Sequence, residues 1–345
     1  MIDYNKLITD IIFTNVNNIN SYQLLLFIIV SFIISYVIDM LFGELPTKIH
    51  PVVIIGSIIT FFKNIFIKIR KKTSGLLLVL CTYLVSSVII YLFYFIFSFN
   101  IIILFILFTI LLSSTFSVNM LLQTAKDVKN DLDESIDKAR KSVSYLVSRN
   151  TDELTESFIV SAVIESMTEN ITDSYIAPIF YYLIFGYIII IHPINDPLFY
   201  LLLIPIFYRI SNTMDAMVGY KTDELKEIGF VPAKLDDLLN LIPSRIAGLY
   251  VVLSAYLIKL DGKNALKIML RDAGKCPSPN SGYTMASTAG ALNIQLIKKD
   301  TYILGDDNKD INKDDISNAV KLSKLTIILF TLTIIILFSL LYVIL

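Results

Sequence analysis

Long apolar runs dominate this chain and restrict what it can fold into. Four of them are 21 to 24 residues long and together hold one charged residue, Asp39; they cover residues 22–42, 76–99, 101–122 and 325–345. A helix of about 20 apolar residues crosses the hydrocarbon core of a bilayer. Further runs cover 175–191, 198–210 and, with interruptions, 238–258. Because 55% of the residues are hydrophobic, we predict an all-α polytopic membrane protein with about six to seven membrane helices, forming a single integral membrane domain over residues 1–345.

The positions of the basic residues indicate which polar segments face the cytoplasm. Residues 43–75 contain six Lys and Arg side chains against one acid, Glu44, and the positive-inside rule places such a segment on the cytoplasmic side. Within it, the apolar stretch 52–69 is interrupted by lysines, which predicts an amphipathic helix in the membrane interface. A helical hairpin that turns near Asn100 then returns the chain to the cytoplasm.

The main polar loops are therefore predicted to be cytoplasmic, in a multi-pass protein of the cell membrane. These loops cover residues 39–56, 123–174, 211–246 and 276–305. No basic face dominates a soluble domain, so a nucleic acid is not expected as a partner. The chain also lacks the G-x-x-x-x-G-K-[S/T], G-x-G-x-x-G and H-E-x-x-H motifs, so no common nucleotide or zinc motif identifies a reaction.

The largest polar segment, residues 123–174, ends directly against an apolar run. We predict two helices in it, the first with an apolar stripe over 132–147 and the second beginning at Thr151 as N-cap. Near its end Glu165, Glu169 and Asp173 follow one another at steps of four, which places them along one side of a helix. Acidic side chains at the edge of a membrane are costly unless they bind something.

Further polar clusters are predicted to face the same compartment. They comprise Asn212, Asp215, Tyr220 and Lys221; Lys234, Asp236, Asp237 and Arg245; and Ser278, Asn280 and Ser281, with His50 following Asp39 and Glu44 at the membrane edge. Carboxylate and amide oxygens suit Mg²⁺, while Arg and Lys suit phosphate groups. One acid pair alone is more often a solvated surface. Several clusters at helix–membrane junctions instead favour a membrane enzyme with an anionic, phosphorylated substrate.

The run 238–258 raises a problem of topology. If it spans the membrane fully, the following basic helix, 259–275, falls outside, against the charge rule. Either 238–258 enters and returns, or the small-residue stretch 283–297 crosses back. Arg245 at mid-membrane would cost about 2.5 to 3.5 kcal/mol, which favours a broken or re-entrant segment lining a polar cavity.

The same motifs resemble the CobD/CbiB family, the adenosylcobinamide-phosphate synthases of cobalamin biosynthesis. The matching segments run from about residue 22 to 305 and include 39–56, 139–151, 162–186, 212–221, 229–246, 278–282, 289–292, and Tyr302 with Gly305. The combination of ES-x-x-EN-x-x-D, NT-x-D-x-MVGY and SPN-x-G is highly specific. Departures from the usual family pattern are Asn150, Ser174, Lys234, and Lys298 with Lys299 where Gly-Gly is frequent.

The resemblance implies an amide-forming ligase. Family members join aminopropanol, free or as its O-phosphate, to the remaining propionate of adenosylcobyric acid at the membrane. A carboxylate and an amine do not condense favourably in water, so ATP with Mg²⁺ is expected from the type of reaction. Expected partners are the corrinoid, the aminopropanol (phosphate), the lipid bilayer and other enzymes of the pathway.

Candidate site residues follow from these motifs. The catalytic candidates are Glu165, Glu169, Asn170, Asp173, Asn212, Asp215, Asp236 and Asp237. The candidates for binding substrate or phosphate are His50, Arg140, Arg149, Lys221, Arg245, Ser278 and Asn280. The candidate Mg²⁺ ligands are Glu165, Glu169, Asp173 and Asp215. The sequence assigns no general base.

Two alternatives belong to other classes. A Mg²⁺-dependent prenyl- or phosphatidyl-type transferase also uses acidic clusters, but its usual N-D-x-x-D-like or D-G-x-x-A-R-like motif is not present as such. A non-catalytic signalling relative with the same membrane framework would have lost several of the polar motifs, and this chain keeps them.

Overall fold

Apolar helices of membrane-spanning length account for most of the structure, a computed structural model that describes residues 19–147 and 149–344. Among the described residues seven helical segments are long and apolar enough to cross a membrane: Ser21–Phe42, Pro51–Ile69, Lys72–Phe97, Ile101–Glu134, Glu156–Ile191, Pro197–Val218 and Lys313–Leu341. The bent pair Phe230–Leu239 and Leu241–Leu257 would add an eighth span. The predicted all-α polytopic class and the number of membrane helices are confirmed.

The chain forms two compact units that interleave along the sequence. Unit 1 contains the residues up to Ser117, Pro178–Asp236 and the residues from Ile335, and unit 2 contains Val118–Ala177 and Asp237–Ile334. The single membrane domain expected from the sequence stays a prediction.

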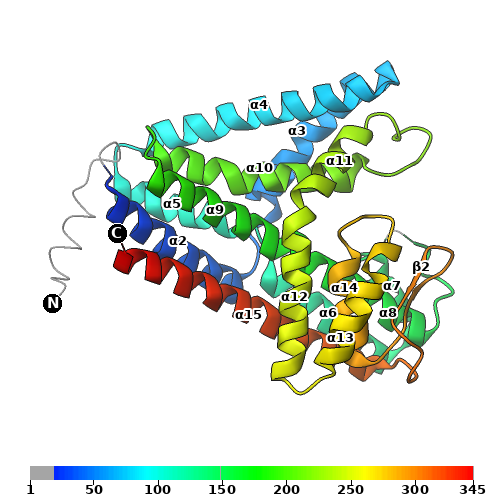
Figure 1. Cartoon of the computed structure of the whole chain (residues 1–345). Helices are drawn as coiled ribbons and strands as arrows, with labels where there is room; N and C mark the ends of the chain where they lie inside the picture. The colour runs from blue at the N-terminus through cyan, green and yellow to red at the C-terminus, as the bar shows by residue number, and fades with distance from the viewer. Residues whose placement is uncertain (1–18, 148, 345) are drawn as a thin grey trace. The chain divides into compact units, whose positions relative to one another are not determined.

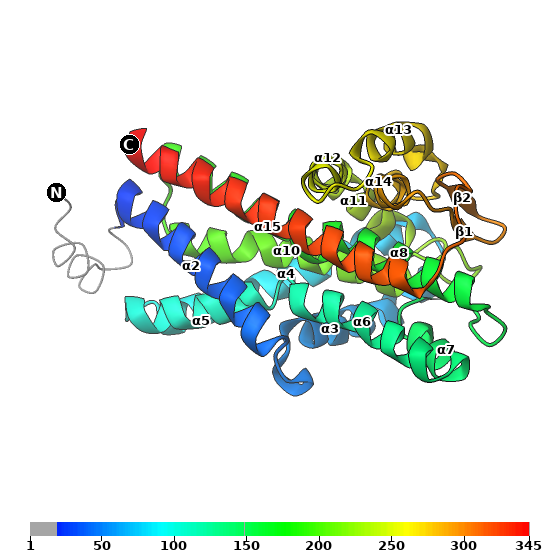
Figure 2. The same ribbon diagram turned by 90° about the horizontal axis from the view of Figure 1, so that it is seen from below.

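Unit 1 is built from long helices that pack through aromatic and small polar side chains. Its helices are α2 (Ser21–Phe42), α3 (Pro51–Phe66), α4 (Lys72–Phe97), α5 (Ile101–Ser113), most of α9 (Ala177–Ile191), α10 (Pro197–Val218) and most of α11 (Phe230–Leu239), with short 3-10 turns at Thr47–Ile49 and Ile67–Ile69. Helices α2 and α5 lie side by side (Figure 2), where Phe27 contacts Phe108 edge to face and the Ser35 hydroxyl donates to the Thr109 carbonyl over 2.8 Å. Tyr83 of α4 stacks on Phe207 of α10 with ring centroids 4.4 Å apart.

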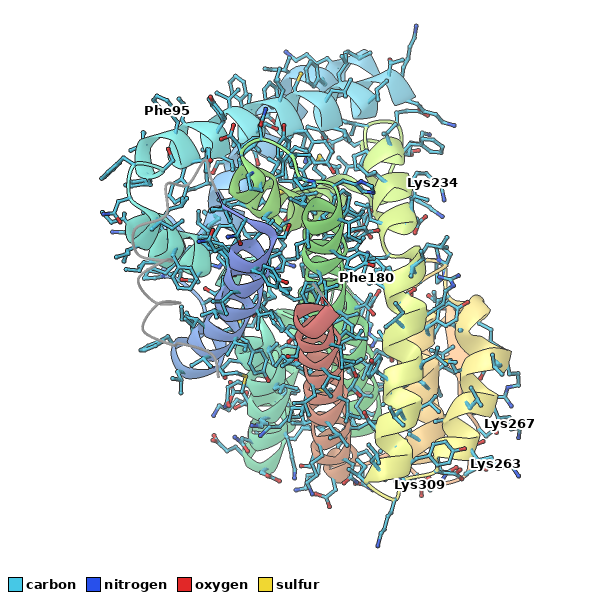
Figure 3. The ribbon with its side chains drawn as sticks, turned by 60° about the vertical axis from the view of Figure 1, so that its left-hand side comes forward. Phe95, Phe180, Lys234, Lys263, Lys267 and Lys309 are labelled. Carbon is cyan, nitrogen blue, oxygen red and sulfur yellow. The ribbon has the colours of Figure 1, made fainter. Side chains whose placement is uncertain are left out.

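The outer faces of these helices remain apolar. On α4, Leu84 is 66% exposed and Phe95, labelled in Figure 3, is 67% exposed. Exposed apolar surface of this extent is typical of a protein that contacts lipid.

The predicted hairpin turn is confirmed, because Asn100 caps α5 by accepting the Ile102 and Ile103 amides.

Unit 2 surrounds a helix made of small residues. Its elements are α6 (Val118–Glu134), α7 (Ile136–Ser144), α8 (Glu156–Ile171), α12 (Leu241–Leu257), α13 (Gly262–Asp272), a 3-10 turn at Ala273–Lys275, α14 (Gly282–Leu292), β1 (Leu296–Lys298), β2 (Tyr302–Leu304) and the first part of α15 (Lys313–Ile344). Every residue of α14 except Tyr283 is buried. Helices α12, α13 and α14 lie together (Figure 1). A Cβ on Gly290 would stand 2.6 Å from the Asn264 carbonyl oxygen, so close packing of α13 on α14 requires glycine there.

The polar segment 123–174 differs from its prediction in two places. It contributes to three helices, not two, because Ser135 ends the first and caps α7 by accepting the Lys138 amide over 3.2 Å. The N-cap of α8 is Thr155, while Thr151 lies in a turn closed by the Leu154 amide. The predicted N-cap at Thr151 was therefore wrong.

Helix α8 continues into α9 through a single π-turn, Thr172–Ile176. Proline at position 178 donates no amide hydrogen bond, and its ring crowds the carbonyl four residues earlier, which a regular α-helix does not tolerate. The wider π-turn accommodates this proline. As a result the acidic helix and the apolar run after it form one stretch, Glu156–Ile191.

Other helix boundaries also differ from the predicted ones. The interruption predicted in 238–258 is present, but the chain bends by 48° between α11 and α12, at Asn240, and Arg245 lies inside the regular helix α12. Helix α10 extends to Val218, so Asn212 and Asp215 are helical rather than in a loop. Helix α15 begins at Lys313, before the predicted start at 325. The interfacial position of 52–69 stays a prediction, since α3 is also long and apolar enough to cross.

Candidate functional site

A polar pocket of about 150 Å³ lies within unit 2, beside α8. Its walls come from α8, from the segment between α7 and α8, and from the β1–β2 hairpin; the lining residues are Leu146, Val147, Arg149, Ala162, Glu165, Ser166, Glu169, Asn170, Lys298 and Tyr302. Four of the predicted site residues, Arg149, Glu165, Glu169 and Asn170, therefore meet in one place.

Glu165 is a buried acid of this pocket, only 4% exposed. Its Oε1 accepts a 2.6 Å hydrogen bond from Ser161, one helical turn earlier, and its Oε2 accepts a 2.8 Å bond from the Tyr302 hydroxyl. Arg149 forms an ion pair with it, with Nη2 at 3.3 Å from Oε2. A buried carboxylate is tolerated only when such donors replace water.

The hairpin is fixed to α8 next to this carboxylate. Strands β1 and β2 are antiparallel, with Lys298 paired to Tyr302. The Ile297 amide donates to the Ser161 hydroxyl over 2.9 Å, and the same hydroxyl donates to Glu165. Figure 2 shows the hairpin beside α8. The position of Lys298 is thus tied to the position of the buried acid.

Burial and the neighbouring acids keep two other groups of this site protonated. Burial, and then the charge of Glu165, raise the pKa of Tyr302 far above its usual range, so its hydroxyl stays a donor. Burial, and then the charges of Glu169 and Glu165, raise the pKa of the Cys276 thiol to about 11, against the opposing effect of a hydrogen bond from Ser281. Because the thiolate is the nucleophilic form, Cys276 is not an activated nucleophile at neutral pH.

A second group of predicted residues meets at the bend between α11 and α12. The Arg245 guanidinium donates to Asn280 Oδ1 over 3.1 Å and lies 4.3 Å from the centroid of the Tyr283 ring. The Asn280 amide donates to the Asp237 carbonyl over 2.7 Å, and Ser278 donates to the Asp237 carboxylate over 3.4 Å. These contacts give Arg245, in an otherwise apolar helix, the polar partners that it needs.

A comparison with known protein families decides the identity of the chain. A family model described as "CobD/Cbib protein" matches residues 32–323. This chain belongs to the CobD/CbiB family. It is 43% identical over 303 residues to a "Probable cobalamin biosynthesis protein CobD" of Methanothermobacter thermautotrophicus, covering 87% of this chain and 94% of the relative. Proteins of the same description are 40% identical in Methanococcus aeolicus, over 90% of this chain and 96% of the relative, and 36% identical in Methanocaldococcus jannaschii, over 86% and 94%. No solved structure matches the chain.

A third group of predicted residues belongs to unit 1. The Asn212 amide donates to Asp236 over 3.4 Å, and Asn212 Oδ1 accepts from Arg209 over 3.4 Å. His50 caps α3 by accepting the Val52 amide at Nδ1. Burial lowers the pKa of His50; Glu44 opposes this shift, and Arg209 adds to it. The histidine is therefore mostly neutral at pH 7, which is the form that accepts the cap hydrogen bond.

Several predicted residues have other surroundings. Arg140 is not among the pocket residues, since its Nε donates to the Leu154 carbonyl and its Nη1 to Asp137. Asp173 is half-buried in the π-turn. Lys221 is exposed after the end of α10, which carries Asp215.

Two of the four predicted Mg²⁺ ligands lie in the pocket, and the metal role of all four stays a prediction. Glu165 and Glu169 share the pocket, whereas Asp215 belongs to unit 1. In the part of the chain that the structure describes, no group of three or more His, Cys, Asp and Glu side chains is arranged to hold a metal ion. Two carboxylates and the Asn170 amide still fit a Mg²⁺ ion that arrives with substrate phosphates, because this ion usually takes one or two carboxylates and keeps phosphate and water ligands.

The polar residues around Glu165 that were missing from the candidates drawn from sequence include Ser161, Lys298 and Tyr302. Ser161 lies four residues before Glu165, so helical spacing could have identified it. Lys298 and Tyr302 come from a strand pair more than a hundred residues away in sequence, and no local pattern connects them with α8.

Proposed function

We propose that this chain is the membrane enzyme of cobalamin biosynthesis that converts adenosylcobyric acid to adenosylcobinamide or its phosphate. The new bond is an amide between the remaining propionate of the corrinoid and aminopropanol or aminopropanol O-phosphate. Membership of the CobD/CbiB family supports this assignment, and it does not favour the transferase alternative. The main polar loops are proposed to face the cytoplasm, where these substrates would be met.

The observation that carries the chemistry is the mixed charge of the pocket. Two carboxylates, Glu165 and Glu169, stand with two cations, Arg149 and Lys298, in one half-enclosed space. A site that joins an amine to an activated carboxylate has to hold both positive and negative groups. Preorganised charges of both signs are what such a transition state requires.

We further propose that ATP with Mg²⁺ is the co-substrate. A propionate oxygen would bond to the terminal phosphorus as ADP leaves; the amine nitrogen would then bond to the carbonyl carbon as phosphate leaves and the nitrogen loses a proton. In this scheme Arg149 stabilises anionic oxygens and Glu169 faces the cationic groups, while the bonds from Ser161 and Tyr302 keep Glu165 in position. Glu165, Glu169 and Asn170 are the pocket residues whose donor atoms suit Mg²⁺.

Incubation of membranes that contain the protein with adenosylcobyric acid, ATP, Mg²⁺ and aminopropanol phosphate tests this assignment. The corrinoid should gain the mass of the amine minus one water, and the gain should require ATP. Membranes from the same cells without the protein serve as the control. A corrinoid that stays unchanged in the complete mixture would contradict the proposal.

A further inference from the structure

The cations of the Glu165 pocket keep hydrogen-bond donors that the neighbouring acids do not engage. Arg149 Nη2 donates to the Glu165 carboxylate over 3.3 Å, which is a long contact. Its Nε is buried and has no hydrogen-bond partner in the described structure. A guanidinium carries five N–H donors. Arg149 therefore keeps donor capacity after its bond to Glu165.

Lys298 lines the same pocket and has fewer anionic contacts than Arg149. It forms no ion pair among residues 19–147 and 149–344, and its Nζ lies 5.9 Å from the centroid of the Tyr302 ring. It is half-buried and lines the pocket. The main-chain bond from Ile297 to Ser161 holds its strand against α8. A half-buried ammonium and a guanidinium that line one pocket favour the binding of an anion such as phosphate.

The size of the pocket limits that anion. A volume of about 150 Å³ is well above the roughly 10–15 Å³ that a cavity needs to hold one water molecule. A phosphate group has five heavy atoms and fits. A corrinoid ring system is far too large for this space.

We propose that Lys298 and Arg149 form a subsite for the phosphate group of a phosphorylated substrate, a proposal that rests on the function proposed above. Lys298 is then a specificity-determining residue. Two substrates of that reaction carry such a group, the O-phosphate of aminopropanol and the terminal phosphate of ATP. Glu165 and Glu169 offset the two cations, so that the subsite releases its anion after turnover.

The test replaces Lys298 by Met, which keeps the side-chain length and removes the charge. Loss of one charge-assisted hydrogen bond should raise the KM for a phosphorylated substrate by about 10- to 100-fold. The KM for adenosylcobyric acid should not change. Lys298→Arg should restore most of the affinity. Lys299→Met is the matched control, because Lys299 is the exposed neighbour in sequence and does not line the pocket.

The two phosphate sources are separated by titrating each in turn. A raised KM for aminopropanol phosphate, with free aminopropanol unaffected, supports the subsite and assigns it to the amine. A raised KM for ATP alone supports it and assigns it to the nucleotide. Changes below twofold for both substrates would overturn the proposal, and so would an equal rise for adenosylcobyric acid.

A binding measurement tests the phosphate subsite independently of the proposed amide-forming function. Thermal unfolding of the purified protein in detergent is followed with aminopropanol phosphate, ATP or inorganic phosphate added. If the wild type makes no amide but is stabilised by one of these ligands, and the Lys298→Met protein is not, the function fails and the subsite stands. If the wild type makes the amide and both proteins respond equally to every ligand, the subsite fails alone.

Discussion

Unit 2 contains two buried carboxylates that contact the same β-hairpin in different ways. Asp272 is fully buried. Its carboxylate accepts hydrogen bonds from Nε and Nη2 of Arg271 at 2.7 Å each, from Lys275 at 2.6 Å and from the Gly305 amide at 2.9 Å. Glu165 meets one cation, at 3.3 Å, and two hydroxyl groups. One acid is closely surrounded by charge, and the other faces a pocket.

This difference separates a structural ion cluster from a binding site. The contacts of Asp272 join the end of α13 to Gly305, just after β2. Gly305 has φ +87°, and a Cβ there would lie 2.2 Å from the Ile294 carbonyl oxygen, so only glycine fits. Arg271 also pairs with Asp306 at 2.7 Å. A carboxylate with this many close donors has little capacity for a ligand, whereas the loosely paired Glu165 and its neighbour Glu169 still border open space.

The largest effect is expected at Glu169. Glu169→Gln removes a pocket charge without removing volume, so turnover should fall by about 10³-fold, roughly 4 kcal/mol, while unfolding of the protein changes little. Amide formation and thermal unfolding in detergent are measured on the same preparation. Activity within tenfold of the wild type would place Glu169 outside the chemistry and weaken the contrast with Asp272.

The reverse pattern is expected at Asp272. Asp272→Asn leaves Arg271 and Lys275 without their buried anion, which should lower the free energy of unfolding by about 3 kcal/mol. Lys267→Ala is a suitable control on the same helix, because Lys267 points away from α13 into the surroundings (Figure 3). The readout is denaturant or thermal unfolding. If Asp272→Asn leaves stability unchanged, this cluster does not hold the hairpin.

The basic side predicted for residues 259–275 shows why sequence alone could not make this distinction. Lys259, Lys263, Lys267, Arg271 and Lys275 follow one another at steps of four, which predicts a helix, and the structure has one over Gly262–Asp272. Lys263 and Lys267 point outward from α13 (Figure 3). Arg271 and Lys275 follow the same spacing but pair with Asp272. Periodicity reports which side of a helix a residue is on, and it carries no information about what packs against that side.

The same limit applies to the candidate site: the sequence predicted relations within one helix but not contacts with distant segments. The steps of four along α8 correctly placed Glu165 and Glu169 together, because that relation lies within one helix. The partners Tyr302 and Lys298 reach the pocket only through the folding of a distant hairpin. Arg140 bonds to Asp137 and Leu154 and does not line the pocket, and its predicted role in binding phosphate stays a prediction.

The smallest predicted effect is a loss of folding stability at acid pH. Burial alone would raise the pKa of Asp272, but the hydrogen bonds from Arg271, Lys275 and the Gly305 amide outweigh it and hold the pKa at about 2. The unfolded chain should titrate this carboxyl near its ordinary value of about 3.9. Above about pH 4 the carboxyl is ionised in both states, so its stabilising contribution is complete. As the pH falls toward 2, the unfolded state takes up the proton first, and about 2 kcal/mol of stability is lost. Thermal unfolding of the wild type should therefore approach that of Asp272→Asn between pH 4 and pH 2; a gap that stays constant over this range would show that the ionised form of Asp272 does not stabilise the fold.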